Sequence, residues 1–82
     1  MNDYDPALMI AVERIVRPVF AHFNTKLRMR EELYGLLSEI YNEEAARADS
    51  PEDALRESIR RLGDAEALTC ELQATVPWHN FP

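Results

Sequence analysis

The sequence of 82 residues contains little glycine and almost no cysteine. Its two glycines, Gly35 and Gly63, are too few for a phosphate-binding loop or for the Gly-x-Ser-x-Gly turn that carries a nucleophilic serine. The single cysteine, Cys70, excludes an intrachain disulfide and favours a reducing compartment. We expect Cys70 to be a small packing residue near the apolar face of its helix.

Long apolar runs and an excess of basic charge are also missing. No run approaches the ~18–20 apolar residues that span a bilayer, and the first residues lack the basic and apolar segments of a signal peptide. The formal net charge of −6 disfavours binding to nucleic acid or to a flat anionic membrane. These features predict a soluble protein.

The residue types that carry enzyme chemistry do not occur at the spacings that such chemistry needs. The two histidines, His22 and His79, are far apart in the sequence, and neither belongs to a Glu-x-x-His or His-Glu-x-x-His motif. The carboxylates of residues 39–49 lack the spacing of a calcium loop and are typical of a solvated helix face. We therefore expect a non-enzymatic protein without a catalytic residue, a metal site or a cofactor.

Apolar residues recur at helical spacing along most of the chain, which predicts an all-α fold, a small compact bundle of about four helices. We expect helices over residues 6–23, 25–48, 51–62 and 64–75, in one domain covering 1–76 with a C-terminal tail at 77–82. Pro18 interrupts the first of these helices. Because the apolar stripe continues in phase beyond it, a kinked helix is favoured over two short helices. The stripe comprises Leu8, Val12, Ile15, Val16, Val19 and Phe23.

The second predicted helix has Asn24-Thr25 as its capping signal. One of its sides carries Leu33, Leu36, Leu37, Ile40, Tyr41 and Glu44. Its bases come before its acids, an order that opposes the helix dipole, and we interpret the bases as a solvated surface. These bases are Lys26, Arg28 and Arg30. Pairs four residues apart are also expected, namely Glu43–Arg47, Glu52–Arg56 and Glu57–Arg61.

The stretch from Ser50 to Leu72 reads as two helices joined at a single glycine. Ser50 is a good N-cap, and Pro51 falls at the first helical position, where its missing N–H is harmless. Gly63 is expected to have a positive φ because it ends one helix while Asp64 caps the next without a spacer. The second of these helices carries no base to meet phosphate, so a DNA-binding helix-turn-helix is disfavoured.

The segments Arg30-Glu-Glu-Leu33, Ser50-Pro-Glu-Asp-Ala54 and Arg61-Leu-Gly-Asp-Ala-Glu-Ala-Leu68 resemble the HAAS-type signalling domain, also found as the prefix domain of bacterial permease-like membrane proteins. The similarity covers residues 29–72. The family often has histidines where this chain has Leu36 and Ile40, glycine at Ala48 and proline at Ala65. The resemblance implies a cytoplasmic, non-enzymatic module ahead of transmembrane helices, with residues 77–82 as the juxtamembrane linker.

Two functional hypotheses remain open at this point. One is an interaction or regulatory module that binds a protein partner, including a second copy of itself, with membrane contact only through a downstream transmembrane segment. The other is a self-contained acidic protein that binds and inhibits a basic partner, as antitoxins do.

Large apolar residues at both ends of the chain suggest the contact surface of such a module. The residues proposed for this surface are Ile10, Phe20, Trp78 and Phe81, because a domain this small has a thin core. Two other interpretations stay open: the residues close the bundle as core, or the tail aromatics approach a membrane interface.

Overall fold

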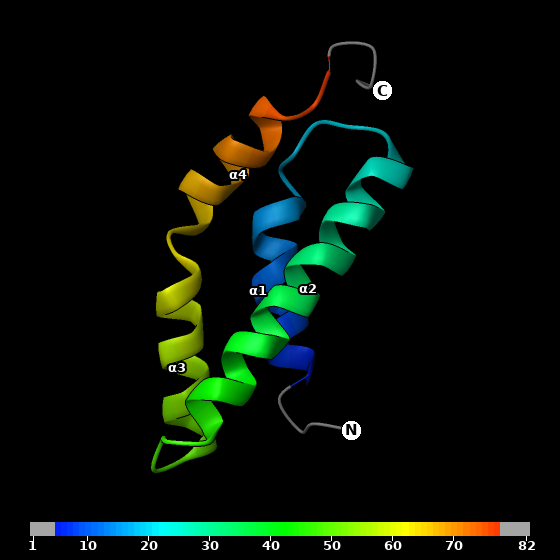
Figure 1. Cartoon of the computed structure of the whole chain (residues 1–82). Coiled ribbons are helices and arrows are strands. Elements are labelled where there is room, and N and C mark those ends of the chain that lie inside the picture. Colours follow the sequence, from blue (N-terminus) through cyan, green and yellow to red (C-terminus); the bar gives the residue numbers. More distant parts are fainter. Residues whose placement is uncertain (1–4, 78–82) are drawn as a thin grey trace.

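The structure is a computed structural model that describes residues 5–77, which form four helices and the turns between them (Figure 1). The helices are α1 (Asp5–Val16), α2 (Phe23–Ala45), α3 (Pro51–Leu62) and α4 (Ala65–Ala74). The predicted all-α class and the number of helices are confirmed. Within the described part of the chain, no helix combines the length and apolarity needed to cross a membrane.

The long helix α2 is the support on which the bundle is assembled. Helices α1 and α3 both pack on α2, whereas α4 packs on α1 (Figure 1). The core cluster formed at these contacts comprises Leu8, Val12, Val16, Val19, Ala21, Met29, Leu37, Tyr41, Ala54 and Val76. This cluster draws on α1, α2, α3, the linker after α1 and Val76 just beyond α4, and the partly buried Leu72 of α4 packs against it, so the described residues share one core.

The Ser50–Asp64 stretch forms as the sequence predicts. The Ser50 hydroxyl accepts the Asp53 N–H at 3.2 Å, and Pro51 is the first residue of α3. The Asp64 carboxylate accepts the Ala67 N–H at 3.2 Å and caps α4. Both helices therefore begin with one of their free N–H groups satisfied by a side chain.

Gly63 joins α3 to α4 with a backbone conformation that glycine alone adopts easily. Its φ is 113° and its ψ is −174°. The positive φ confirms the prediction, although the ψ lies far from the left-handed helical value of about +47°. A Cβ at this position would meet nothing closer than Leu68 Cδ1 at 3.9 Å, so the requirement for glycine is conformational and not steric.

Helix α1 ends at Val16, so the predicted kinked helix over 6–23 is wrong, and the alternative of a second short helix does not form either. Pro18 has no N–H for the carbonyl four residues earlier, and its ring crowds that turn. The Val19 N–H donates to the Val16 carbonyl at 3.0 Å in a tight turn. Residues 17–22 then form an irregular linker to α2.

Ending α1 early changes the role of Phe23. Leu8, Val12, Ile15, Val16 and Val19 are buried as the stripe predicts, whereas the Phe23 residue is 72% exposed. The helical phase that would have buried Phe23 stops at Pro18, and Phe23 instead opens α2. The predicted Asn24-Thr25 cap is also wrong, because His22 occupies the N-cap position without a capping side-chain hydrogen bond.

Glu44 is the one carboxylate in the described chain that is almost fully covered, at 7% exposure. It accepts a hydrogen bond from Arg47 at 2.7 Å and one from Arg61 of α3 at 2.8 Å. These bonds, with Arg47 as the larger cause, lower the pKa of Glu44. The Glu44–Arg61 pair therefore links the end of α2 to α3.

Ion pairs of the other arginines in this region also form at spacings other than the predicted four residues. Arg56 binds Asp53 at 2.9 Å and Arg60 binds Glu57 at 2.7 Å, so both pairs span three residues. Arg61 reaches across to α2, which its long side chain permits and a sequence-spacing rule does not anticipate.

The two glycines provide a matched test of the α3–α4 junction. We expect Gly63→Ala to destabilise the protein by about 1–3 kcal/mol, since alanine is strained at this φ and ψ. Gly35 lies in the interior of α2 with no atom within 4 Å of an added Cβ, so Gly35→Ala should stabilise by about 0.5–1 kcal/mol. Chemical denaturation measures both, and shifts of the same sign would contradict the assignment.

The Glu44 cluster predicts an acid-dependent loss of stability. A carboxylate with a lowered folded pKa stabilises the fold above its unfolded pKa, and this contribution disappears as the pH falls through the folded pKa. Glu44→Gln should therefore lower the Tm at pH 7. The difference in Tm between this variant and the parent should shrink as the pH falls towards about 3. The exposed Glu39→Gln on the same helix is the control, and an equal effect of both variants would refute the role of Glu44.

Candidate functional site

The candidate functional site lies where the α1–α2 linker meets α4 (Figure 1). Proline at position 18 and the tight turn after it leave the Ile15 carbonyl without its helical donor, because the Val19 N–H binds Val16 instead. The Thr69 hydroxyl of α4 lies 2.7 Å from this carbonyl and 2.9 Å from the Ala65 carbonyl. The Thr69 hydroxyl of α4 thus supplies a hydrogen-bond donor to a carbonyl in the last turn of α1.

Gln73 attaches the linker one helical turn further along α4. Its Oε1 accepts the Phe20 N–H at 2.7 Å, and its Nε2 donates to the Phe20 carbonyl at 3.0 Å. One amide side chain therefore binds both backbone groups of Phe20. Thr69 and Gln73 are four residues apart, so they lie on the same face of α4 and fix the linker together.

Two of the three bases at the start of α2 bind α1 or the residue just after it, which corrects their interpretation as a solvated surface. Lys26 Nζ donates to the Arg17 carbonyl at 2.8 Å, next to the C-terminal end of α1, where a positive charge is favourable. Arg30 binds both oxygens of Glu13 at 2.8 and 2.9 Å, and this hydrogen bonding lowers the pKa of Glu13. Only Arg28 of the three stays exposed without a carboxylate partner in residues 5–77.

With its backbone fixed, the linker end presents three large apolar side chains to solvent. Phe20 is 54% exposed, Phe23 is 72% exposed and Leu27 is 41% exposed. Phe23 and Leu27 are four residues apart on α2 and are therefore surface neighbours. We call these three residues the linker patch.

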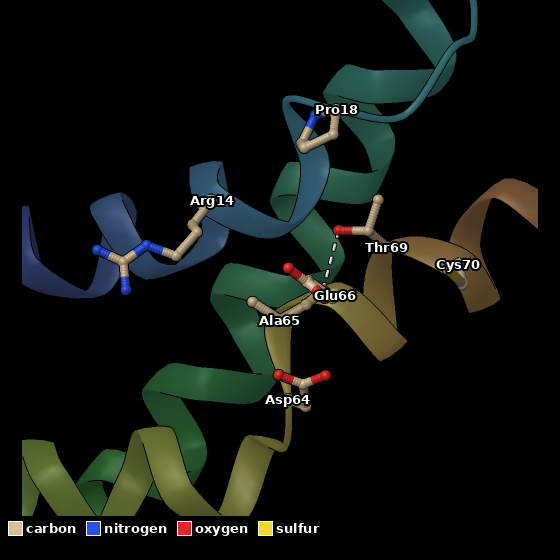
Figure 2. A pocket seen from close by; sticks show the side chains of 7 residues that line it. All are labelled: Arg14, Pro18, Asp64, Ala65, Glu66, Thr69 and Cys70. Carbon is tan, nitrogen blue, oxygen red and sulfur yellow. Dashed lines mark hydrogen bonds between the residues drawn. The ribbon is translucent and has the colours of Figure 1, made fainter.

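A hollow of about 760 Å³ opens on the other side of the linker, between α1 and the start of α4 (Figure 2). Its lining consists of Arg14, Pro18, Asp64, Ala65, Glu66, Thr69 and Cys70. In Figure 2 the Arg14 guanidinium points away from the carboxylates of Asp64 and Glu66. The Asp64 carboxylate is already used as a helix cap, and the lining holds a thiol without a histidine. The hollow therefore lacks the nucleophile–base arrangement of a covalent catalyst.

Of the predicted contact residues, the structure describes Ile10 and Phe20. Ile10 is 61% exposed on α1 and lies ten residues before Phe20, which is in the linker. Trp78 and Phe81, like His79, lie outside the described residues. Cys70 is exposed, so its predicted packing role is wrong. Residues 5–77 contain no group of three or more side chains suited to hold a metal ion.

Several residues that build this site escape sequence reasoning. Thr69, Gln73 and Lys26 each bind a backbone group of another segment, which for Thr69 and Gln73 lies more than 50 residues away in the sequence. Only the position of Pro18 hints at a carbonyl left to be satisfied. The exposure of Phe23 follows from the helix break, so the same proline was the available signal.

No model of a protein family, no curated protein and no solved structure matches this chain in sequence or in fold. The candidate site therefore has to be judged on its own geometry.

Thr69→Val tests whether α4 completes the end of α1. Valine keeps the shape of threonine but leaves the Ile15 carbonyl without its donor, so we expect a loss of about 1–3 kcal/mol in the free energy of unfolding. Thr75→Val is the control, because the exposed Thr75 hydroxyl bonds only the Leu72 carbonyl of its own helix end. Equal losses in urea titrations would mean that the contact with α1 contributes nothing special.

Proposed function

We propose that this chain is a non-enzymatic helical module that binds a protein partner through the linker patch of Phe20, Phe23 and Leu27. The observation that carries the proposal is a contrast within one short segment. The backbone of Phe20 is held by two hydrogen bonds to Gln73, while the side chains of Phe20 and Phe23 remain more than half exposed. Aromatic residues on a fixed backbone lose little conformational entropy on binding and are common interface anchors.

The exposed apolar groups support contact with a protein more than they support closure of the bundle. A core already forms without the linker patch, since Val19 and Ala21 of the same linker are buried in it. Side chains alternate here between burial and exposure, so the exposed ones are available to another chain. Ile10 belongs to the predicted contact surface but lies on α1, and we do not assign it to the linker patch.

The resemblance to the HAAS-type signalling domain agrees with a binding role for the module. On this proposal the module works on the cytoplasmic side of a membrane, ahead of transmembrane helices encoded downstream. Reading the gene beyond codon 82 tests that part of the proposal directly. A reading frame that continues into apolar segments of about 20 residues supports it, and a stop codon there contradicts it.

An acidic protein that inhibits a basic partner is the second candidate function, and the net charge of −6 is the observation that favours it. Its support is weaker at the end of α2 and in α3, because carboxylates there are already bound to arginines. The pairs are Glu44 with Arg47 and Arg61, Asp53 with Arg56, and Glu57 with Arg60. A basic partner would have to displace these arginines.

Site-specific photo-crosslinking in the native host tests the proposal. A benzophenone amino acid in place of Phe23 should give a discrete adduct with a partner protein, whereas the same group in place of Glu39, exposed further along α2, should not. An adduct of twice the chain mass of 9.5 kDa identifies a second copy as the partner. Equal crosslinking from both positions would contradict a role for the linker patch.

A stability measurement separates binding from folding. Because the Phe23 residue is 72% exposed, Phe23→Ser should leave the Tm close to that of the parent while abolishing the adduct formed from a probe at Phe20. A large loss of Tm would assign Phe23 to the core and refute its role as a contact.

A further inference from the structure

The surroundings of the linker patch carry a charge that is opposite to that of the rest of the chain. Residues 14–30 contain five of the nine lysines and arginines and none of the fifteen acids. They cover the end of α1, the linker and the first turns of α2. The strongly acidic average of the chain therefore conceals a basic end at which the exposed aromatics are concentrated.

Several of these charges remain available to a ligand. Arg17 and Arg28 are exposed, and neither has a carboxylate within 4.0 Å among residues 5–77. Lys26 donates its ammonium group to the Arg17 carbonyl and forms no ion pair within 4.0 Å among residues 5–77, although its charge acts on Glu13. The first turn of α2 contains no acid and has no capping side chain, so the positive end of the helix dipole adds to the same potential.

The exposed acids nearest to the patch on α2, Glu31 and Glu32, follow Leu27 by four and five residues, and the other acids of this helix lie further away. Glu39 and Glu43 follow Phe23 by 16 and 20 residues on α2, which corresponds to about 25–30 Å along the helix axis. That distance is about three times the Debye length at physiological ionic strength. Residues 14–30 are thus basic, whereas the rest of α2 is acidic.

We propose that the partner of the linker patch is an acidic amphipathic helix of another protein, an inference that rests on the proposed function. Its apolar residues would pack on Phe20, Phe23 and Leu27, and its carboxylates would face Arg17, Lys26 and Arg28. A flat anionic membrane fits less well, because Glu31 and Glu32 are exposed one turn beyond Leu27 and would approach the lipid headgroups.

A second copy of this chain is the other occupant that the same charges allow, and it fits less well than a separate acidic helix. The acids of α3 are bound to arginines of the same helix, as in Asp53 with Arg56 and Glu57 with Arg60. The exposed face of α3 consequently carries both acids and bases. A dimer through two basic ends would repel itself.

The test measures binding of the full chain to a labelled synthetic peptide of about 18 residues, five helical turns. The peptide has leucine and phenylalanine on one face and glutamate elsewhere, and a control peptide replaces every glutamate by lysine. By fluorescence anisotropy we expect saturable binding of the acidic peptide and at least about tenfold weaker binding of the lysine peptide. Raising the salt from about 0.05 M to about 0.5 M should also weaken the acidic complex several-fold.

Variants locate the contact. Phe23→Ser should weaken binding at least about tenfold, as loss of an interface anchor does, and Arg28→Gln should weaken it and reduce the salt dependence. Ile10→Ser is the matched control, since Ile10 is 61% exposed on α1 outside the patch. An equal effect of Ile10→Ser, or equal binding of the two peptides, overturns the inference.

The remaining outcomes identify other occupants. Binding to phosphatidylglycerol vesicles but not to the acidic peptide would make the patch a membrane contact. Concentration-dependent dimerisation that Phe23→Ser abolishes, again without peptide binding, would make it a self-interface. If Phe23 forms its adduct with a partner in the host but the acidic peptide neither binds nor competes, the partner chemistry is wrong while the proposed function stands.

Discussion

The helix break at Pro18 determines the arrangement of this end of the molecule. Because α1 stops at Val16, the carbonyls of Ile15 in its last turn and of Arg17 just beyond it bind donors from two different helices. Thr69 of α4 binds the Ile15 carbonyl and Lys26 of α2 binds the Arg17 carbonyl. The helix break is therefore the point at which α1, α2 and α4 are joined. Val19 and Ala21 of the linker are buried in the core there.

The opposite end of α2 is held by a different interaction. Glu44 is covered by the guanidinium groups of Arg47 and Arg61, so a nearly buried charge is paired twice. Breaking one partner of such a pair leaves an uncompensated charge, which costs more than the intact pair contributes. The long helix is fixed near its start by the Lys26 bond to the Arg17 carbonyl and by the Glu13–Arg30 pair, and at its end by the pairing of Glu44 with two arginines.

The sequence predicts local features of this fold well and long-range features poorly. The Ser50 and Asp64 caps, the bounds of α3 and the positive φ of Gly63 depend on neighbouring residues, and all were predictable. The kinked first helix was the main error, since the apolar stripe through Phe23 outweighed the proline. Thr69, Gln73 and Arg61 could not be assigned in advance, because each binds a group on another segment whose position depends on the whole bundle.

The start of α2 combines features that an isolated helix would avoid, and they have a common physical cause. Bases near a helix N-terminus oppose its dipole, but α1 runs antiparallel and ends beside this turn, so the same bases face the negative end of α1. That arrangement explains Lys26 and Arg30 through stability alone. It does not account for the exposed Arg28, for His22 at the N-cap without a side-chain hydrogen bond, or for Phe23, which is 72% exposed. An acidic ligand with an apolar face would contact all three, and this supports the proposed binding surface.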